Sequence, residues 1–588
     1  MRFLRNVLAT IVGLFIFFGV LFFGMIAVGA AMGSSSDKVM VKDNSVINLD
    51  LSGVKYDYAG KFNYKDFGFV DAGKDGLSDV LAAIEYAKTD DRIKGISILN
   101  NESQLGIVQR REVRKKLEEF KKSGKFVLAY ANVYSQGEYY LNSVADTVYL
   151  NPVGALDFKG LSTEILYLKG LQEKTGVQME VIRHGKYKSA VEPYIEDKMS
   201  DANREQTTVF LNSIWETIVG DIAQSRKIPV DSLNAIANKL SARTSPRALK
   251  VGLVDKVVYE DEYHAAIKKA LKVEGDKDYN TIDILDYAKD LILKDLGKVS
   301  EDKIAVIYAQ GQILSGEGSV SYVGEGSINR ALKAARTDDK VKAIVLRVNS
   351  PGGSALTSEL IWREIELTKK VKPVIVSMGD VAASGGYYIA CNADRIFADP
   401  STITGSIGVF GMVPNFKSLA TKYGVNAEQV KTHDNAANYS PFRDVDPAFK
   451  MVVTEGIEDI YTTFVQRVAD GRKLTVAQVD ELAQGRVWTG KDALKNKLVD
   501  ELGGLDNAIT YAAKKVEIDS YKVVNYPEYK MKFEDLLRNY LGSSMLKTEE
   551  QLIKEKIGEA NYEMMERLNY FNNMKGIQAI MPFELKID

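Results

Sequence analysis

Two long segments of this 588-residue chain repeat one another, and this repeat constrains the fold more than any other feature. The segment Ala87-Lys-Thr-Asp-Asp-Arg-Ile-Lys-Gly-Ile recurs as Ala335-Arg-Thr-Asp-Asp-Lys-Val-Lys-Ala-Ile, and the two begin 248 positions apart. The same spacing relates three further pairs, Tyr139-Tyr140 with Tyr387-Tyr388, Asp146 with Asp394, and Pro152 with Pro400. A chain of this length is expected to hold more than one domain, so we expect two copies of one domain.

The repeat sets the expected domain boundaries. Within each copy, short apolar β-rich runs alternate with helical patterns, which predicts an α/β fold with parallel strand pairing. Between the copies, the apolar periodic stretch Ile282–Leu296 predicts a linking helix. The expected division is a cytoplasmic N-terminus with a transmembrane anchor (1–36), a first copy (46–275), the linking helix (276–300), a second copy (301–525) and a helical C-terminal tail used in packing or assembly (526–588).

The N-terminus carries a long apolar run. Arg2 and Arg5 precede the nearly uninterrupted apolar stretch Val7–Met32, and about 20 apolar residues are enough to cross a bilayer. Positive charge before the run favours an orientation with the N-terminus inside. A cleaved signal peptide is the alternative, but its apolar core is usually about 7–15 residues long. We expect a retained transmembrane helix, with the rest of the chain outside the cytoplasm.

Composition excludes several kinds of site. Cys391 is the only cysteine, so neither an intrachain disulfide nor a cysteine-rich metal site can form. The chain has only three histidines, and its net charge of −2 gives no basic footprint for nucleic acid. We therefore expect no metal, no other cofactor and no nucleic-acid partner. Because histidine is scarce, a general base is expected to be a different residue.

The second copy contains special residues that the first copy lacks. Ser350-Pro351-Gly352-Gly353 follows one predicted strand, and Ser384-Gly385-Gly386 follows another. At the matching positions of the first copy, Gln136 replaces Ser384 and Glu138 replaces Gly386. The frame of the domain was kept while these residues were not. This contrast makes the second copy the candidate for chemistry.

The setting of Ser384 is typical of a catalytic nucleophile. It lies between a predicted strand end and a predicted helix start, where free N–H groups face outward. The main-chain N–H groups of Gly353 and Gly385 could converge as an oxyanion hole. Each motif alone could be an ordinary turn or a helix N-cap. Together they predict a serine nucleophile.

The base is less certain from the residues alone. Lys188 precedes a small, apolar stretch that could remove it from water and so lower its pKa. Lysine is an established alternative to histidine as the activator of a serine. His433 lies in the same copy as Ser384, and His184 lies near Lys188. Both histidines remain competing candidates at this point.

Four motifs make the chain resemble the signal peptide peptidase A (protease IV) family, peptidase family S49, in its long, tandem-domain bacterial form. They are Tyr187–Pro193, Ser350–Gly353, Asp380–Tyr388 and Thr404–Gly408. The resemblance implies tandem Clp-protease/crotonase-like domains and a Ser/Lys dyad of Ser384 and Lys188. It also implies that Ser406 supports the lysine by hydrogen bonding.

The resemblance further implies a membrane-anchored serine endopeptidase that works through an acyl-enzyme. The implied substrates are signal peptides already released from their proteins, together with other unfolded or membrane-associated peptides. The implied assembly is a homotetramer at the bacterial inner membrane. Each subunit would cross the membrane once, with its catalytic domains on the extracytoplasmic, periplasmic side.

Two alternatives to a peptidase follow from the same frame. A crotonase-like acyl-CoA hydratase or isomerase would share the fold, since a fold does not determine function. CoA thioesters are cytoplasmic, however, and the expected location is not. An inactive scaffold is the other alternative, because the first copy keeps the frame without the serine. The intact motifs of the second copy argue against it.

Overall fold

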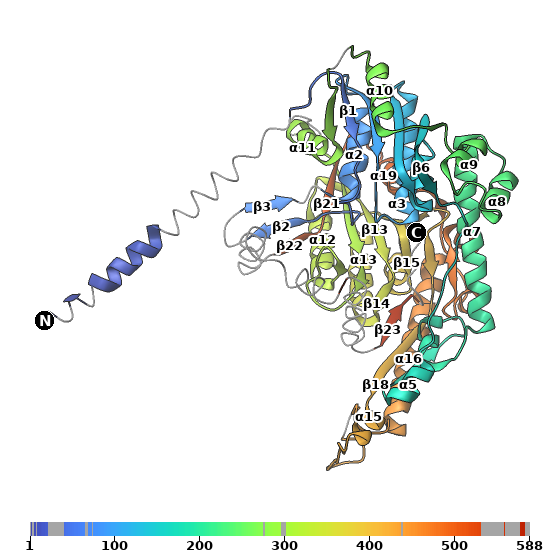
Figure 1. Ribbon diagram of the computed structural model, residues 1–588. Helices are drawn as coiled ribbons and strands as arrows, with labels where there is room; N and C mark the ends of the chain where they lie inside the picture. Colours follow the sequence, from blue (N-terminus) through green and yellow to red (C-terminus); the bar gives the residue numbers. More distant parts are fainter. Residues whose placement is uncertain are drawn as a thin grey trace.

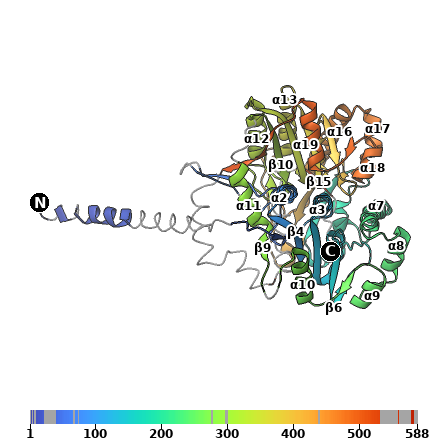
Figure 2. The same ribbon diagram turned by 90° about the horizontal axis from the view of Figure 1, so that it is seen from above.

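The computed structural model describes residues 2, 5–6, 9–20, 40–64, 69–72, 75–274, 277–295, 301–436, 439–530, 558 and 577–581. Two large sheets with helices on their faces form the body, and two smaller sheets join them (Figures 1 and 2). In Figure 1, β18, α5 and α15 extend from one end of this body. The alternation of strands and helices confirms the predicted α/β fold.

The first large sheet has six strands in the order β8-β6-β5-β4-β1-β9, and every neighbouring pair is parallel. Its central strands are apolar and buried, as expected for a parallel sheet covered on both faces. The strands are β1 (Ser45–Asn48), β4 (Ile93–Leu99), β5 (Phe126–Tyr134), β6 (Thr147–Leu156), β8 (Lys256–Val257) and β9 (Asn280–Asp283).

The second large sheet repeats this order. The sequence β9-β1-β4-β5-β6-β8 of the first sheet recurs as β21-β10-β13-β15-β16-β20, again with parallel pairing. Strand β17 also pairs with β15, and β19 pairs antiparallel with β17. The strands are β10 (Lys303–Gln310), β13 (Val341–Ser350), β15 (Val374–Ala383), β16 (Arg395–Ala398), β17 (Ile403–Gly405), β19 (Val487–Thr489), β20 (Glu501–Leu502) and β21 (Lys522–Tyr526).

Helices cover both faces of each large sheet. In the first half α2 (Leu77–Ala87), α3 (Ile107–Lys122) and α11 (Ile284–Asp295) pack in one core and α10 (Glu260–Leu271) in another. In the second half α12 (Glu325–Thr337), α13 (Ala355–Lys369) and α16 (Pro447–Arg472) oppose α19 (Leu505–Lys515). The other helices are α4 (Gln136–Asn142), α5 (Lys169–Thr175), a 3-10 turn (Ser189–Val191), α6 (Glu192–Ile195), α7 (Asp201–Arg226), α8 (Val230–Asn238), α9 (Ser245–Lys250), α14 (Gly385–Ala390), α15 (Lys417–Lys422), α17 (Val476–Leu482) and α18 (Gly490–Lys495).

The two smaller sheets contain strands from both halves. One has the order β12-β11-β14-β23-β18-β7, and the other has the order β22-β2-β3. Strand β7 of the first half pairs antiparallel with β18 of the second, with His184 opposite Val409. The strands are β2 (Lys61–Tyr64), β3 (Phe69–Ala72), β7 (Gln178–His184), β11 (Gln312–Ile313), β12 (Tyr322–Val323), β14 (Gly352–Ser354), β18 (Val409–Asn415), β22 (Glu528–Lys530) and β23 (Gln578–Ile580).

Two expected helical segments contain strands. In the expected linker 276–300, β9 completes the first sheet before α11 begins. In the expected helical tail 526–588, the described parts include β22 and β23, which pair with strands of the body. The reason is tertiary, since short segments take their conformation from the free edges beside them. The rest of the predicted tail lies outside the described residues.

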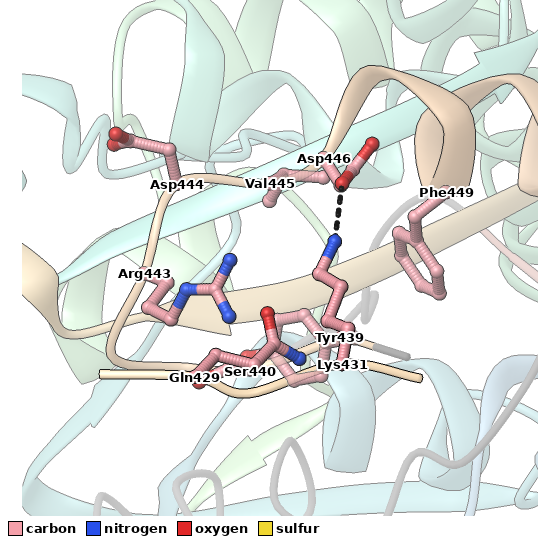
Figure 3. A pocket seen from close by; sticks show the side chains of 9 residues that line it. All are labelled: Gln429, Lys431, Tyr439, Ser440, Arg443, Asp444, Val445, Asp446 and Phe449. Carbon is pink, nitrogen blue, oxygen red and sulfur yellow. Dashed lines mark ion pairs between the residues drawn. The ribbon is translucent and has the colours of Figure 1, made fainter. Parts of the chain in front are cut away.

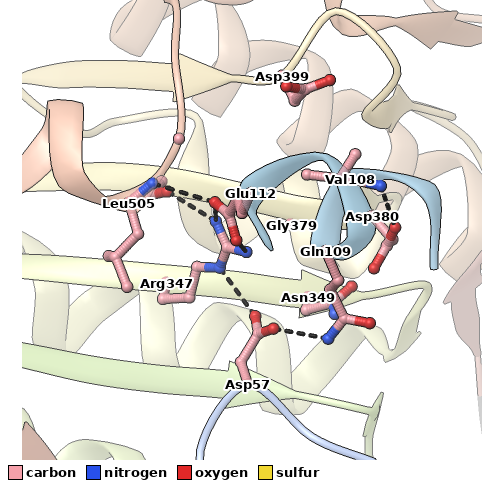
Figure 4. Close-up of polar contacts among 12 residues, drawn as sticks. Asp57, Val108, Gln109, Glu112, Arg347, Asn349, Gly379, Asp380, Asp399 and Leu505 are labelled. Carbon is pink, nitrogen blue, oxygen red and sulfur yellow. Dashed lines mark hydrogen bonds and ion pairs between the residues drawn. The ribbon is translucent and has the colours of Figure 1, made fainter. Parts of the chain in front are cut away.

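Buried charges join the two halves, as Figure 4 shows. Arg347 on β13 is 1% exposed, and its guanidinium lies 2.8 Å from Asp57 and 2.9 Å from Glu112 of the first half. Nearby, the Val108 N–H at the start of α3 donates to the Asp380 carboxylate at 2.8 Å. Since an unpaired buried charge is very costly, these contacts hold the halves in one arrangement.

Residues 9–20 of the predicted anchor form a helix. Among the helices that the structure describes, none is long and apolar enough to cross a membrane. Residues 21–32 of the predicted span lie outside the described residues.

Candidate active site

Ser384 follows the last residue of β15 and immediately precedes α14. Its backbone has φ 56° and ψ −116°, a conformation that residues with a side chain rarely adopt. Such a residue costs roughly 1–3 kcal/mol and persists only where its surroundings impose it. Here the Ser384 N–H donates to the Gly405 carbonyl at 2.8 Å, and the residue is fully buried. The sharp turn places the hydroxyl at the end of the strand.

Lys188 reaches the serine from the other half of the same chain. It follows β7, whose pairing with β18 carries the lysine segment onto the second half. Its side chain is fully buried, and Nζ lies 2.8 Å from the Ser384 Oγ. Nζ also lies 3.1 Å from both the main-chain oxygen and the hydroxyl of Ser406. The structure therefore places Ser384, Lys188 and Ser406 together, the three residues that the family resemblance implies for one site.

These three contacts fit a neutral amine. A neutral lysine has two N–H donors and one lone pair. The Ser406 carbonyl can only accept, so it takes one N–H, and the Ser406 hydroxyl can accept the other. The lone pair then remains for the proton of the Ser384 hydroxyl. In that neutral form the lysine can accept the serine proton.

Burial lowers the pKa of Lys188 well below its ordinary value of 10.5, because removing an ammonium from water disfavours the charged form. Desolvation is the cause of this shift. A lysine in this environment can therefore be neutral, and act as a base, at a lower pH than a surface lysine.

The predicted oxyanion residue Gly385 lies next to Gly352, the neighbour in sequence of the other predicted residue, Gly353. Gly352 has φ +96° and Gly353 has φ +154°, so both need the freedom of glycine. A side chain on Gly352 would begin 2.6 Å from the Gly385 nitrogen, so only glycine allows this close approach. Gly353 pairs antiparallel with Ala579 of β23, and the Ala579 carbonyl also lies beside Gly385. Both predicted donors therefore lie near Ala579 of the chain itself.

Both competing histidines have other partners. His184 Nδ1 lies 2.8 Å from Glu458, and its ring stacks on Tyr461 at 3.7 Å between centroids. His433 is exposed, and its Nδ1 lies 3.1 Å from the Thr432 hydroxyl. Among the residues that the structure describes, Lys188 and neither histidine lies beside Ser384.

The matching position of the first half is closed by structural hydrogen bonds. The Gln136 side chain accepts from the Lys159 and Gly160 N–H groups, each at 2.9 Å, and donates to the Gly160 carbonyl at 3.0 Å. Gln136 lies within α4, whose N-cap Ser135 has an ordinary φ of −65°. The first copy thus lacks both the strained turn and the hydroxyl.

A separate small pocket in the second half is lined by nine residues (Figure 3). It includes Lys431, the last lysine before the region of the second copy that matches the Lys188 segment. Lys431 lies 3.6 Å from Asp446, so its charge is paired with a carboxylate at this exposed site. The pocket therefore offers an ion pair and no equivalent of the Ser384–Lys188 contact.

The sequence analysis missed the turn that packs on Lys188. Gly485 has φ +78°, and a side chain on it would begin 2.6 Å from the Lys188 nitrogen. The Gln484 carbonyl accepts from the Tyr187 N–H at 2.8 Å, and the Arg486 carbonyl accepts from the Ser406 N–H at 2.7 Å. A single Gln-Gly pair in a polar turn gives no sequence signal of such a contact. Within the described ranges, no group of three potential metal ligands gathers.

Comparison with known proteins gives a consistent result. The model of peptidase family S49 matches residues 119–274 and 366–519, one segment in each half. Protease 4 of Haemophilus influenzae is 37% identical over 85% of this chain and 83% of its own length. Protease 4 of Salmonella typhi is 36% identical over 89% of this chain and 87% of its own length. The chloroplastic serine protease SPPA of Arabidopsis thaliana is 33% identical over 83% of this chain and 72% of its own length.

A solved structure matches part of the chain. A ClpP1 mutant of Listeria monocytogenes is 13% identical, covers 35% of this chain and 94% of its own, and has a TM-score of 0.24. A TM-score this low does not establish a shared fold, so the Clp-like character of the two domains stays a prediction.

Proposed function

The chain belongs to peptidase family S49 and is a serine peptidase, and on that premise we propose that Ser384 and Lys188 are its catalytic dyad. One observation carries the proposal, the 2.8 Å contact between the fully buried Lys188 Nζ and the Ser384 Oγ. Membership of a peptidase family also argues against the alternative hypothesis of an acyl-CoA hydratase or isomerase.

Catalysis would proceed in two steps. Neutral Lys188 takes the Ser384 proton as Oγ forms a bond to the peptide carbonyl carbon. The N–H groups of Gly353 and Gly385 stabilise the oxyanion, and Lys188 passes the proton to the leaving amine as the C–N bond breaks. Water then attacks the acyl-enzyme, with Lys188 accepting its proton and returning one to Ser384. Ser406 keeps the lysine directed at the serine throughout.

An extended peptide fits the site. Strand β23 lies antiparallel to both β14 and β18, with its backbone beside the predicted oxyanion glycines. If a peptide replaced β23, β14 and β18 could bind it through main-chain hydrogen bonds, as strands with a free edge do. We therefore propose endopeptidase activity on unfolded peptides, of which released signal peptides are the leading candidates.

The cellular setting is proposed from the sequence. The apolar run Val7–Met32 would anchor each subunit in the bacterial inner membrane, with the catalytic domains on the periplasmic side. Such anchoring would keep the enzyme next to signal peptides left in the bilayer. We further propose a homotetramer. Sedimentation with membranes, and the mass of the detergent-solubilised enzyme, would test these two statements.

Paired variants test the dyad in the full-length enzyme. Ser384→Ala should abolish cleavage of an unfolded peptide and labelling by a fluorophosphonate probe. Lys188→Ala should reduce kcat/KM near pH 7 by at least ~100-fold, because general-base catalysis contributes about 10²–10⁴-fold. Lys431→Ala is the matched control, since it removes an ion-paired lysine of the second half and should leave the rate unchanged. Retained activity of Lys188→Ala near pH 7 would move the base assignment to a histidine.

A further inference from the structure

A buried glutamine on α7 contacts the residues on both sides of Lys188. Gln206 is 1% exposed, and its side-chain nitrogen lies 3.1 Å from the Tyr187 carbonyl and 3.0 Å from the Ser189 hydroxyl. Its side-chain oxygen accepts from the Val487 N–H at 3.2 Å. Gln206 therefore connects the residues that flank the lysine with a strand of the other half.

That strand continues to the other group that contacts the lysine. Val487 begins β19, where it pairs with Gly405 of β17. Gly405 immediately precedes Ser406, whose hydroxyl and carbonyl both contact the Lys188 Nζ. One buried amide thus fixes the lysine main chain relative to the strand that holds its hydrogen-bond acceptor.

The repeat supplies an internal comparison. Helices α7 and α16 are both 26 residues long, and their first residues, Asp201 and Pro447, are 246 positions apart. At that spacing, Gln206 corresponds to Val452, which is 61% exposed. The buried, fully bonded glutamine therefore occurs only in the half that carries Lys188. A residue that only stabilised the fold common to both halves would be expected in both of them, and Val452 is no such residue.

Charged groups around the lysine segment pair with one another. Arg486 lies 2.8 Å from Glu205 and Arg183 lies 3.8 Å from Glu192. The Arg183 guanidinium also donates to the Lys188 carbonyl at 3.3 Å. Burial is what lowers the pKa of the Lys188 amine. The exact placement of the segment, and the exclusion of water that follows from it, therefore matters.

We propose that Gln206 is a positioning residue for the proposed base. By holding Tyr187 and Ser189, it aligns Lys188 with Ser384 and Ser406. The inference rests on the proposed dyad. Without the Gln206 amide, the Val487 N–H loses this acceptor and the Tyr187 carbonyl loses one of its donors, so water can enter next to the lysine segment. The lysine would then become easier to protonate and less well aligned, while the peptide-binding strands would be unaffected.

The test compares Gln206→Ala and Gln206→Met with Gln224→Ala in the full-length enzyme, following kcat, KM and the pH dependence of kcat/KM. Gln224 lies exposed on the same helix and serves as the matched control. Both Gln206 variants should move the acidic limb of the kcat/KM profile to higher pH by at least ~1 unit. On that limb, each unit of the shift lowers kcat/KM about tenfold at a given pH. The loss should appear in kcat, with KM within twofold of wild type, and should diminish as the pH rises.

Unfolding midpoints check that each variant folds, and Gln206→Met, which keeps the side-chain volume, carries the test if Gln206→Ala does not fold. A wild-type pH profile in the folded variant would overturn the inference, as would an equal loss at every pH. Lys188→Ala separates the two proposals. If it is inactive while the Gln206 variant has a wild-type profile, the dyad stands and the positioning role falls.

Discussion

At the scale of single residues, the strained backbone of Ser384 is the clearest mark of function. A serine at φ 56° and ψ −116° is less stable than a glycine there, because a side chain crowds the backbone in this region. The chain keeps serine, and so sacrifices stability, at the position where a hydroxyl meets a desolvated amine. Stability and chemistry therefore favour different residues at this position.

Ser384→Gly should consequently raise stability while abolishing activity. Relief of the backbone strain predicts a gain of ~1–2 kcal/mol in the free energy of unfolding, measured by urea denaturation. Ser384→Ala is the matched control, since it removes the hydroxyl but keeps the strained conformation. Equal stabilities of the glycine and alanine variants would show that the turn is not strained.

The two members of the dyad differ in how far the sequence could predict them. Ser384 could be found from its glycine-rich setting and from the contrast with Gln136 in the other copy. Lys188 came from the family resemblance, because 196 residues separate it from the serine and neither spacing nor periodicity relates them. Gln206 gave no signal at all, since a glutamine in a helix is ordinary until its burial is known.

At the scale of secondary-structure elements, β23 is the feature that the sequence analysis did not anticipate. The long strands of the two large sheets can be predicted from their apolar runs. By contrast, Gln578–Ile580 is three residues long and takes its conformation from β14 and β18. It lies where an extended substrate is proposed to bind. The chain's own segment and a peptide would therefore compete for the same two strands.

Ala579→Pro should relieve this competition. Proline cannot donate an N–H to either flanking strand, so β23 should leave the sheet. The expected result is a KM for an unfolded peptide that falls by about threefold or more, with kcat little changed. Ala579→Ser keeps the N–H and is the matched control. A KM that is unchanged or higher in the proline variant would mean that the strand supports the site and does not occupy it.

At the scale of the whole molecule, the proposed active site depends on the two halves being held together. The first half supplies Lys188 and the second supplies Ser384 and Ser406, so the proposed dyad depends on the interface around Arg347, Asp57 and Glu112 (Figure 4). The two copies thus differ in what they contribute, since Gln136 occupies the position of Ser384 in the first copy.

The same interface should make stability depend on pH through Asp380. Burial, and then the neighbouring Asp57, raise the pKa of Asp380 to about 7, although the Val108 N–H and Arg347 act in the other direction. Between the ordinary value of 3.8 and about 7, the folded protein binds a proton that the unfolded chain releases. This contribution to the free energy of unfolding is therefore present at low pH and is lost as the pH rises through that window.

Asp380→Asn should remove this loss, because an amide keeps an acceptor for the Val108 N–H but cannot ionise. Urea denaturation at pH 5 and pH 8 should show that the free energy of unfolding of the variant increases relative to that of the wild type as the pH rises. Asp278→Asn is the control, since the Asp278 side chain is fully exposed and its replacement should have the same effect at both pH values. An Asp380→Asn difference that is equal at pH 5 and pH 8 would contradict the assignment. A confirmed difference would place a titrating carboxyl four residues before Ser384, on the strand that connects the interface of the halves to the nucleophile.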